Sequence, residues 1–196
     1  MDIKPTDKKD KIIIFFDDIK QNSVESAIKD LCKINTDDAE YVKKNREWAE
    51  KNGLTIESVR LDPIQIHFST SGGSCYDGLS LYDAIESSQT PVEITCYGRV
   101  MSMGIVVLLA SNVRRAHKNT TFLIHQAMGL ALGSLSEMKA SVEEVSRVND
   151  IIFGIISSKT KVSQERLKEV LDYKKDWIIT AQEALELGII TEIVTA

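Results

Sequence analysis

Apolar residues recur along the chain with two spacings, one typical of strands and the other of helices. The run IIIFF at 12–16 is short and uniformly apolar, which indicates a buried strand. Apolar and polar residues alternate over 64–68 and again over 92–96, the two-residue period of a half-buried strand. The segments TTFLI at 120–124 and IITEIV at 189–194 complete the set of predicted strands.

Two helices are predicted between the first two strands. Asn22 and Glu25 have the spacing of a capping box, and the apolar residues that follow lie on one helical face. Residues 37–60 are rich in charged residues and are predicted to form a separate surface helix that Gly53 ends.

The later helices include one of unusual length. Residues 78–88 and the apolar run 104–111 are both predicted to be helical. Ser134 and Glu137 form a second capping box, and apolar residues then recur at helical spacing to residue 159 without a proline. A helix over 134–159 would be about 39 Å long, whereas a compact domain of this size has a radius of gyration of about 16 Å. We therefore expect this helix to protrude.

The order of these elements and the composition limit the fold class and the partners. Strands that alternate with helices predict an α/β fold with largely parallel strands, and 196 residues suit one domain, residues 1–196. A net charge of −5 argues against a nucleic-acid partner. No apolar run reaches the roughly 20 residues that cross a bilayer, so no membrane partner is expected.

The cysteines and histidines are few and scattered. Three cysteines without CxxC spacing favour a reducing, cytoplasmic location. His67 lies in a predicted strand, His117 in a basic connector and His125 after another strand, which is no recognisable metal-ligand spacing. We therefore expect no metal and no other cofactor.

Ser102 is the first candidate for chemistry, because it separates a predicted strand from an apolar helix in the segment GRVMSMGIVVLLAS. At a helix N-terminus, unpaired N–H groups and the positive end of the helix dipole stabilise developing negative charge. A serine there suits a nucleophile, with the N–H of Met103 directed at an oxyanion. The same place also suits an N-cap, and this stretch alone favours the cap.

The segment SGGS at 71–74 is a second candidate, because it joins a predicted strand to the next helix. Gly72 and Gly73 let backbone amides approach a ligand closely, as an oxyanion hole or a substrate-binding edge requires. A plain tight turn is the alternative. Neither glycine spacing of the common phosphate-binding loops is present.

His125 and Asp176 are candidate partners for the serine. His125 directly follows a predicted strand, and Asp176 directly precedes the apolar triplet WII. Taken singly, each residue is more readily structural than catalytic. Together with Ser102 and the glycine pair, they supply a nucleophile, a base, an orienting carboxylate and an oxyanion hole.

Four segments extend this pattern into a family resemblance. SGGSCYDGLSLYDAIES, GRVMSMGIVVLLAS, FLIHQAMG and DWIITAQEALELGII resemble, in that order, the signature blocks of ClpP, the proteolytic subunit of the Clp protease. The resemblance runs from about Ile12 to Val194 and is interrupted by residues 37–60, which are therefore expected to be an insertion. It implies the ClpP/crotonase-type fold of stacked β-α units, in which 134–159 would be the protruding handle helix.

The resemblance also implies an activity and an assembly. Ser102 would be the nucleophile, His125 the base and Asp176 the orienting acid of a serine endopeptidase that cleaves unfolded polypeptides through an acyl-enzyme. The main-chain groups bordering the substrate would be those of Gly72 and Ser74, with Gly73 and Met103 forming the oxyanion hole. The protein would be a homo-oligomer, a heptameric ring that stacks in pairs through the handle helix, with an unfoldase ATPase as partner.

The sequence departs from the family at several places. Ser71 and Ala127 stand where the family usually has proline, which leaves the local backbone less restrained. Lys175 replaces an arginine that bridges paired rings, and lysine lacks the bidentate fork. About eleven residues precede the first predicted strand, so we expect a short axial gate and weak engagement of an ATPase.

Two other functions fit part of this pattern. A crotonase-type acyl-CoA enzyme also uses a pair of glycine amides but needs no Ser–His–Asp set. A non-catalytic ring subunit that modulates a host ClpP by co-assembly would need the fold alone. The filled triad positions favour the peptidase, and covalent labelling of Ser102 by a fluorophosphonate would separate it from the acyl-CoA enzyme.

Overall fold

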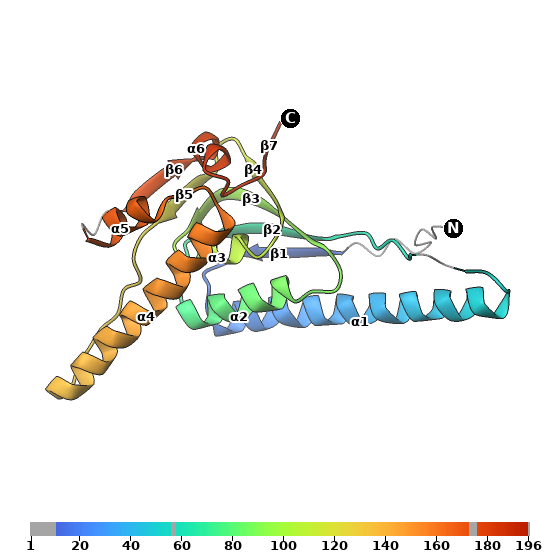
Figure 1. Ribbon diagram of the computed structural model, residues 1–196, viewed down its shortest axis with the longest axis horizontal. Coiled ribbons are helices and arrows are strands. Elements are labelled where there is room, and N and C mark those ends of the chain that lie inside the picture. Colours follow the sequence, from blue (N-terminus) through green and yellow to red (C-terminus); the bar gives the residue numbers. More distant parts are fainter. Residues whose placement is uncertain (1–10, 56–57, 173–175, 196) are drawn as a thin grey trace.

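The computed structural model describes residues 11–55, 58–172 and 176–195 (Figure 1). The strands are β1 (Ile12–Phe16), β2 (Ile64–Thr70), β3 (Val92–Met101), β4 (Val113–His117), β5 (Thr121–Ile124), β6 (Trp177–Thr180) and β7 (Glu192–Val194). The helices are α1 (Gln21–Lys51), α2 (Cys75–Glu86), α3 (Met103–Leu108), α4 (Leu135–Lys159), α5 (Gln164–Asp172) and α6 (Ala181–Glu186). Lys175 and the segment before residue 11, on which two of the expected departures fall, lie outside the described residues.

The strands form one mixed sheet, which confirms the predicted α/β class. Pairing is parallel along the order β1-β2-β3-β4-β7, and β5 pairs in parallel with β3 and antiparallel with β6. β3 changes partner along its length, because Glu93–Cys96 pair with β4 and Arg99–Met101 pair with β5. Gly98 lies between these stretches with a φ of +61°, a conformation that bends the strand and suits glycine.

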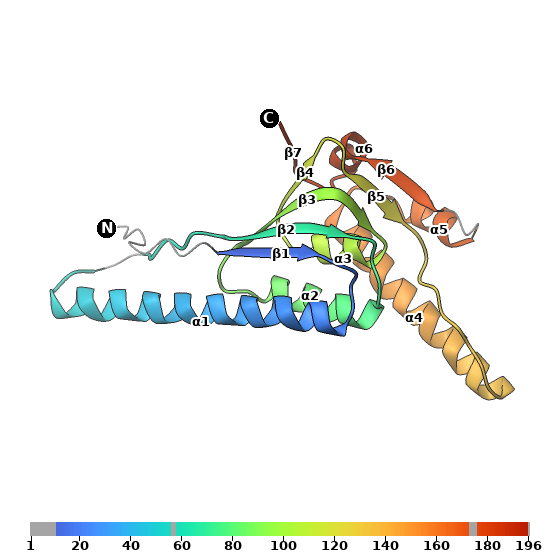
Figure 2. The same cartoon turned by 180° about the vertical axis from the view of Figure 1, so that it is seen from behind.

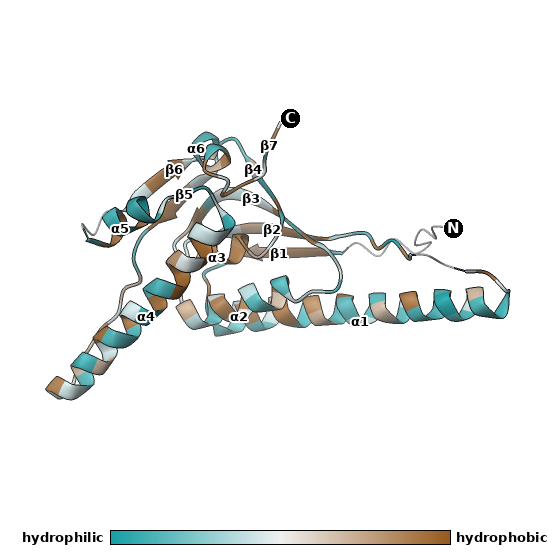
Figure 3. Cartoon of the chain, in the orientation of Figure 1, coloured by the Kyte–Doolittle hydropathy of each residue, from teal (hydrophilic) through white to brown (hydrophobic). Residues whose placement is uncertain are grey.

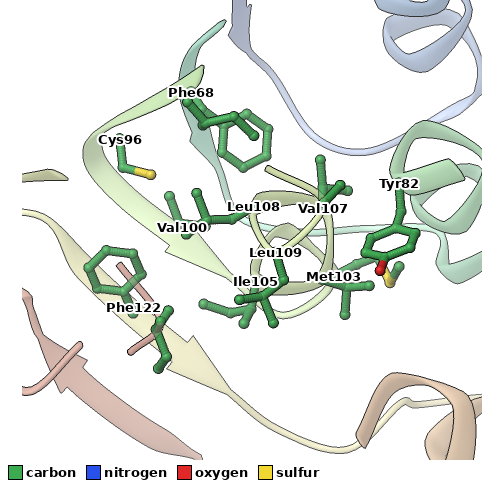
Figure 4. Close-up of a cluster of buried hydrophobic side chains, with 14 of the residues drawn as sticks. Phe68, Tyr82, Cys96, Val100, Met103, Ile105, Val107, Leu108, Leu109 and Phe122 are labelled. Carbon is green, nitrogen blue, oxygen red and sulfur yellow. The ribbon is translucent and has the colours of Figure 1, made fainter. Parts of the chain in front are cut away.

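The core is centred on α3, all six of whose residues are buried. Figure 4 shows its side chains between Phe68 of β2, Phe122 of β5 and Tyr82 of α2. A helix that is apolar all round is stable only when it is covered on every side. This packing fixes the first turn of α3, which begins directly after Ser102.

The predicted protruding helix is confirmed as α4. The Ser134 N–H donates to the Glu137 carboxylate at 2.7 Å, and the Glu137 N–H donates back to the Ser134 hydroxyl at 3.4 Å, completing the predicted capping box. With 25 residues α4 is about 38 Å long. Its first half projects away from the sheet in both views (Figures 1 and 2).

The prediction of two helices over residues 22–60 is wrong, because one helix, α1, runs from Gln21 to Lys51. Its first turn is closed by the Ser23 hydroxyl, which accepts from the Lys20 N–H at 3.3 Å, so Asn22 and Glu25 do not form the cap. The segment 37–51 is thus a continuation of a helix whose first half packs on the core.

The sequence between the two predicted helices does not interrupt α1, for a local reason. Asn35 donates its side-chain amide to the Leu31 carbonyl at 2.9 Å, and the Thr36 hydroxyl donates to the Cys32 carbonyl at 2.9 Å. These bonds satisfy both side chains within the helix, and the Asn35 Oδ1 also accepts from the Thr90 N–H at 3.0 Å, which holds the middle of α1 against the segment before β3. Gly53, with a φ of +67°, follows the helix end as predicted. The second half of α1 overhangs the sheet (Figure 1).

Two strand predictions also need correction. His117, expected to lie in a basic connector, is the last residue of β4, and Arg114 of this strand is buried because its guanidinium donates to the Ile189, Ser111 and Gly188 carbonyls within 3.0 Å. The run 12–16 is half-buried rather than fully buried, with residues 13 and 15 inside and their neighbours exposed.

Across the described parts of the chain, no helix combines the length and the apolar character that a membrane span requires.

Candidate active site

The candidate triad lies where β3 and β5 end and the neighbouring strand β6 begins. β3 and β5 are parallel, so Ser102 and His125 each follow the carboxyl end of a strand. β5 and β6 are antiparallel with Ile124 opposite Trp177, which places Asp176 opposite His125 just beyond the paired residues. β5 therefore brings together three residues that are far apart in the sequence.

The structure brings the three predicted side chains into contact. His125 Nε2 lies 2.7 Å from Ser102 Oγ, a hydrogen-bond distance. His125 Nδ1 lies 3.4 Å from the nearer carboxylate oxygen of Asp176. The imidazole is mostly covered, with 22% of its side chain exposed, whereas 66% of the Asp176 side chain is exposed. The Ser–His contact is thus short and sheltered, and the His–Asp contact is longer and open to solvent.

The Ser102 hydroxyl is not used as a helix cap. Ser102 occupies the N-cap position of α3, but its side chain makes no cap hydrogen bond. Its φ of +54° makes it the sole non-glycine residue with positive φ in the described part of the chain. Such strained backbone is characteristic of functional sites. The Ser102 N–H donates to the Leu123 carbonyl at 2.8 Å, which ties this turn to β5.

The glycine turn is held by Ile19, whose role the sequence did not signal. Gly73 and Ile19 form an isolated parallel bridge. Its hydrogen bonds run from the Ile19 N–H to the Gly72 carbonyl (2.7 Å) and from the Ser74 N–H to the Ile19 carbonyl (2.8 Å). Because the flanking residues supply both bonds, the N–H and C=O of Gly73 point away from Ile19.

Only glycine fits at these two positions. A Cβ on Gly72, whose φ is +96°, would lie 2.6 Å from the Ser102 Cβ and 3.2 Å from the Met103 nitrogen. A Cβ on Gly73, whose φ is +145°, would lie 2.1 Å from the Ile19 carbonyl oxygen. The turn therefore packs directly against the start of α3, which places the predicted oxyanion donors on adjacent segments.

Gly72 and Ser74, predicted to border the substrate, have main-chain groups that already serve the turn. The Gly72 N–H donates to the hydroxyl of Thr70 at 3.1 Å, and the Ser74 carbonyl accepts from the Gly78 N–H at 3.0 Å. The Ser74 side chain caps α2 by accepting from the Asp77 N–H at 3.3 Å. Their contact with a substrate stays a prediction.

Met103 is the first residue of α3, so its N–H lies among those that a helix leaves without an intrahelical partner. Its side chain is buried and lies beside Tyr82 (Figure 4). Packing on α2 is tight, because a Cβ on Gly78 would lie 2.2 Å from the Met103 Cγ. The buried side chain therefore holds the N–H of this residue in place.

The Cys75 thiol, which is the other reactive group discussed near the site, is not activated. Burial raises the pKa of the Cys75 thiol, which lies at the start of α2, so it stays protonated and is a poor nucleophile at neutral pH. Among the described residues, no three histidine, cysteine, aspartate or glutamate side chains are grouped so as to hold a metal ion.

A serine, a histidine and an aspartate in contact at the strand ends of an α/β sheet have the arrangement of a serine hydrolase. The family model of the Clp protease matches residues 53–196. Since this match covers most of the chain, the chain belongs to the Clp protease family.

Curated relatives agree with this assignment, and a solved structure shares the fold. The ATP-dependent Clp protease proteolytic subunit of Deinococcus radiodurans is 32% identical over 133 residues, which are 67% of this chain and 64% of that protein. The subunit of the same name from Bacteroides fragilis is 33% identical over 145 residues, 71% of this chain and 68% of that protein. A ClpP1 mutant from Listeria monocytogenes shares the fold, with a TM-score of 0.75, 24% identity, and coverage of 95% of this chain and 92% of its own.

Proposed function

We propose that the protein is a serine endopeptidase that hydrolyses peptide bonds in unfolded polypeptides. The observation that carries this proposal is the 2.7 Å contact between Ser102 Oγ and His125 Nε2, made by a serine that could have capped α3. A hydroxyl turned toward an imidazole base is the arrangement that activates a serine nucleophile.

The proposed reaction uses the five predicted residues in order. His125 Nε2 accepts the hydroxyl proton as Ser102 Oγ attacks the scissile carbonyl, while Asp176 stabilises the imidazolium that forms. The N–H groups of Gly73 and Met103 hold the oxyanion. His125 then protonates the departing amine, which leaves an ester on Ser102. Water, deprotonated by His125, hydrolyses this ester and regenerates the hydroxyl.

We further propose that the whole chain, as one peptidase domain, works in a homo-oligomeric ring, heptameric and able to stack in pairs through α4. The support is an apolar surface at the projecting end of α4 and in the segment before it. Leu130, Leu132, Leu135 and Val142 are each at least 65% exposed in the single chain, and Figure 3 shows this end as mixed brown and teal. Contiguous exposed apolar side chains mark an interaction surface. An unfoldase ATPase would be the partner that delivers polypeptide to such a ring.

The function is tested by mutating Ser102 and labelling it covalently. Wild-type protein should cleave a fluorogenic peptide and should react with a fluorophosphonate at Ser102, as located by mass spectrometry. Ser102→Ala should lose both properties and keep the native mass of the assembly. Ser87→Ala, which removes an exposed hydroxyl at the end of α2, is the matched control and should behave as wild type.

Three other results would contradict the mechanism or indicate a different function. Cleavage by Ser102→Ala at the wild-type rate would overturn the mechanism. Wild-type protein that neither cleaves nor labels, but joins the rings of an active ClpP in native mass spectra, would be a modulatory subunit. Hydrolysis of acyl-CoA without labelling of Ser102 would indicate a crotonase-type enzyme.

A further inference from the structure

Asn149 is a buried polar residue on α4 whose side chain links two segments of the chain. It is 4% exposed. Its Oδ1 accepts from the Ala127 N–H at 2.7 Å, and its Nδ2 donates to the Val145 carbonyl at 3.0 Å. Since a carbonyl can only accept, the second bond fixes which end of the amide faces Ala127.

Ala127 is two residues beyond His125, in the segment that leaves β5 at the candidate site. It is also the position where the family resemblance leads one to expect proline. Proline has no N–H and cannot make this bond, whereas alanine supplies a donor. The residue that departs from the family pattern therefore makes a hydrogen bond that the usual residue could not make.

The same segment meets α4 at a second point. A Cβ on Gly129 would lie 2.7 Å from a methyl carbon of Val145, so the backbone passes very close to the helix there. Val145 also supplies the carbonyl that orients the Asn149 amide. Residues 127–129 are thus held against one turn of α4, with Asn149 as the polar part of the contact.

α4 is itself fixed where this contact is made. Val148 and Ile152, on either side of Asn149, are buried in the core. One turn earlier, Glu144 accepts hydrogen bonds from the Arg147 guanidinium and from the Tyr76 hydroxyl on α2, and these bonds, the first most strongly, lower the pKa of its carboxyl to about 2. The part of α4 that carries Asn149 is therefore held in place by the core and by α2.

We propose that Asn149 is a positioning residue for His125, holding the segment after β5 so that the imidazole stays at hydrogen-bond distance from Ser102. Asn149 touches neither reacting side chain and acts through Ala127. This inference rests on the proposed peptidase function. Small misplacements of a catalytic group are costly, since a shift of about 1 Å can lower a rate about a hundredfold.

Three variants test the proposal. Asn149→Leu keeps the volume but removes the acceptor, and Ala127→Pro removes the donor. Each should lower kcat for a fluorogenic peptide by about tenfold or more and leave KM within about twofold. The double variant has neither donor nor acceptor, so no buried group is left unpaired, and its kcat should recover to within about threefold of wild type.

Asn45→Leu is the matched control. Asn45 makes the same bond one turn back on its own helix, to the Tyr41 carbonyl at 2.8 Å, but it lies far from the site in the overhanging half of α1. Its kcat should equal that of wild type. A purely structural role for Asn149 would instead lower the melting temperature of Asn149→Leu without changing kcat.

Two readouts keep this inference separate from the proposed function. With active wild-type protein, an unchanged kcat in Asn149→Leu, or a double variant no better than the single ones, would overturn the role of Asn149. With inactive wild-type protein the peptidase proposal fails, and crystal structures decide the positioning role. A His125 Nε2 that stays within 3 Å or so of Ser102 Oγ in Asn149→Leu would overturn it, whereas a displaced ring supports it.

Discussion

The main chain of Gly73 has two roles, one on each side of the residue. One side of the residue lies against Ile19 in the isolated bridge, and its N–H and C=O point to the other side. The bridge thus aims the N–H that we propose as an oxyanion donor. A change at this residue is expected to affect catalysis through backbone position alone.

Gly73→Ala should therefore abolish measurable peptide cleavage. The new Cβ would lie 2.1 Å from the Ile19 carbonyl oxygen, so the turn must move and carry the oxyanion donor with it. Losing one such donor costs about 10² to 10³ in kcat. Gly154→Ala is the control, because a Cβ there meets no atom within 4 Å and replaces glycine within a helix. This control should keep its activity and gain about 0.5–1 kcal/mol in free energy of unfolding.

Asp176 and Asp172 provide a second contrast between neighbouring residues. Asp176 Oδ1 lies 3.4 Å from His125 Nδ1, whereas Asp172 ends α5. Asp176→Asn should lower kcat by about a hundredfold, less than the roughly 10⁴ expected at a buried triad, because this carboxylate is 66% exposed. Asp172→Asn should have no effect. Equal losses in the two variants, measured with the same peptide, would remove the orienting role of Asp176.

At the scale of elements, contacts between residues close in the sequence were partly predictable, whereas contacts between distant segments were missed. The capping box at Ser134 is present as predicted, whereas the one expected at Asn22 is replaced by a bond between Lys20 and Ser23. The pairing of β5 with β6 could not be inferred, although it explains why His125 and Asp176 meet. β4 was missed because the charge of Arg114 is satisfied by carbonyls more than 70 residues away.

The candidate residues of the site were predictable, and their arrangement was not. Ser102 lies at a strand–helix junction that permits either a cap or a nucleophile, and the local sequence favoured the cap. Only the contact with His125 and the positive φ of the serine separate the two. Ile19 and Asn149 were absent from the prediction, because an apolar residue and a helical asparagine carry no signal of what they touch across the fold.

The continuous helix α1 depends on a buried ion pair at its middle. Asp38 lies 2.7 Å from the Lys11 ammonium and also accepts from the Thr90 hydroxyl at 2.5 Å. Both charged side chains are at most 15% exposed. This cluster ties the second half of α1 to β1 and to the segment before β3.

Asp38→Ala should destabilise the protein by about 3 kcal/mol, because it leaves the Lys11 ammonium with the Asp62 carbonyl but with no anionic partner in a poorly solvated place. Glu40→Ala is the control on the same helix. Glu40 lies 3.8 Å from Lys44, and both side chains are more than 60% exposed, so the loss should be at most about 0.5 kcal/mol. Denaturant unfolding measures both values. Equal losses would show that the cluster does not anchor α1.

At the scale of the whole molecule, two of the apolar surfaces that the described residues expose are formed by several side chains from one element. The outer face of β1 exposes residues 12, 14 and 16, and the start of α4 exposes the leucines and valine described above. Stacking of chains through α4 would cover the second surface and would explain why a helix of about 38 Å extends beyond its own sheet.

Pairing of rings through α4 can be tested by two substitutions that introduce a carboxylate on opposite faces of this helix. Val142→Glu puts a charge in the apolar stripe formed with Leu135 and Met138, whereas Ala140→Glu puts the same charge on the other side of the helix. If rings pair through this stripe, native mass spectrometry should show Val142→Glu at half the mass of wild type and Ala140→Glu at full mass. Each variant should keep its fold by circular dichroism, since both residues lie outside the core. An unchanged mass for Val142→Glu would show that rings do not pair through this face of α4.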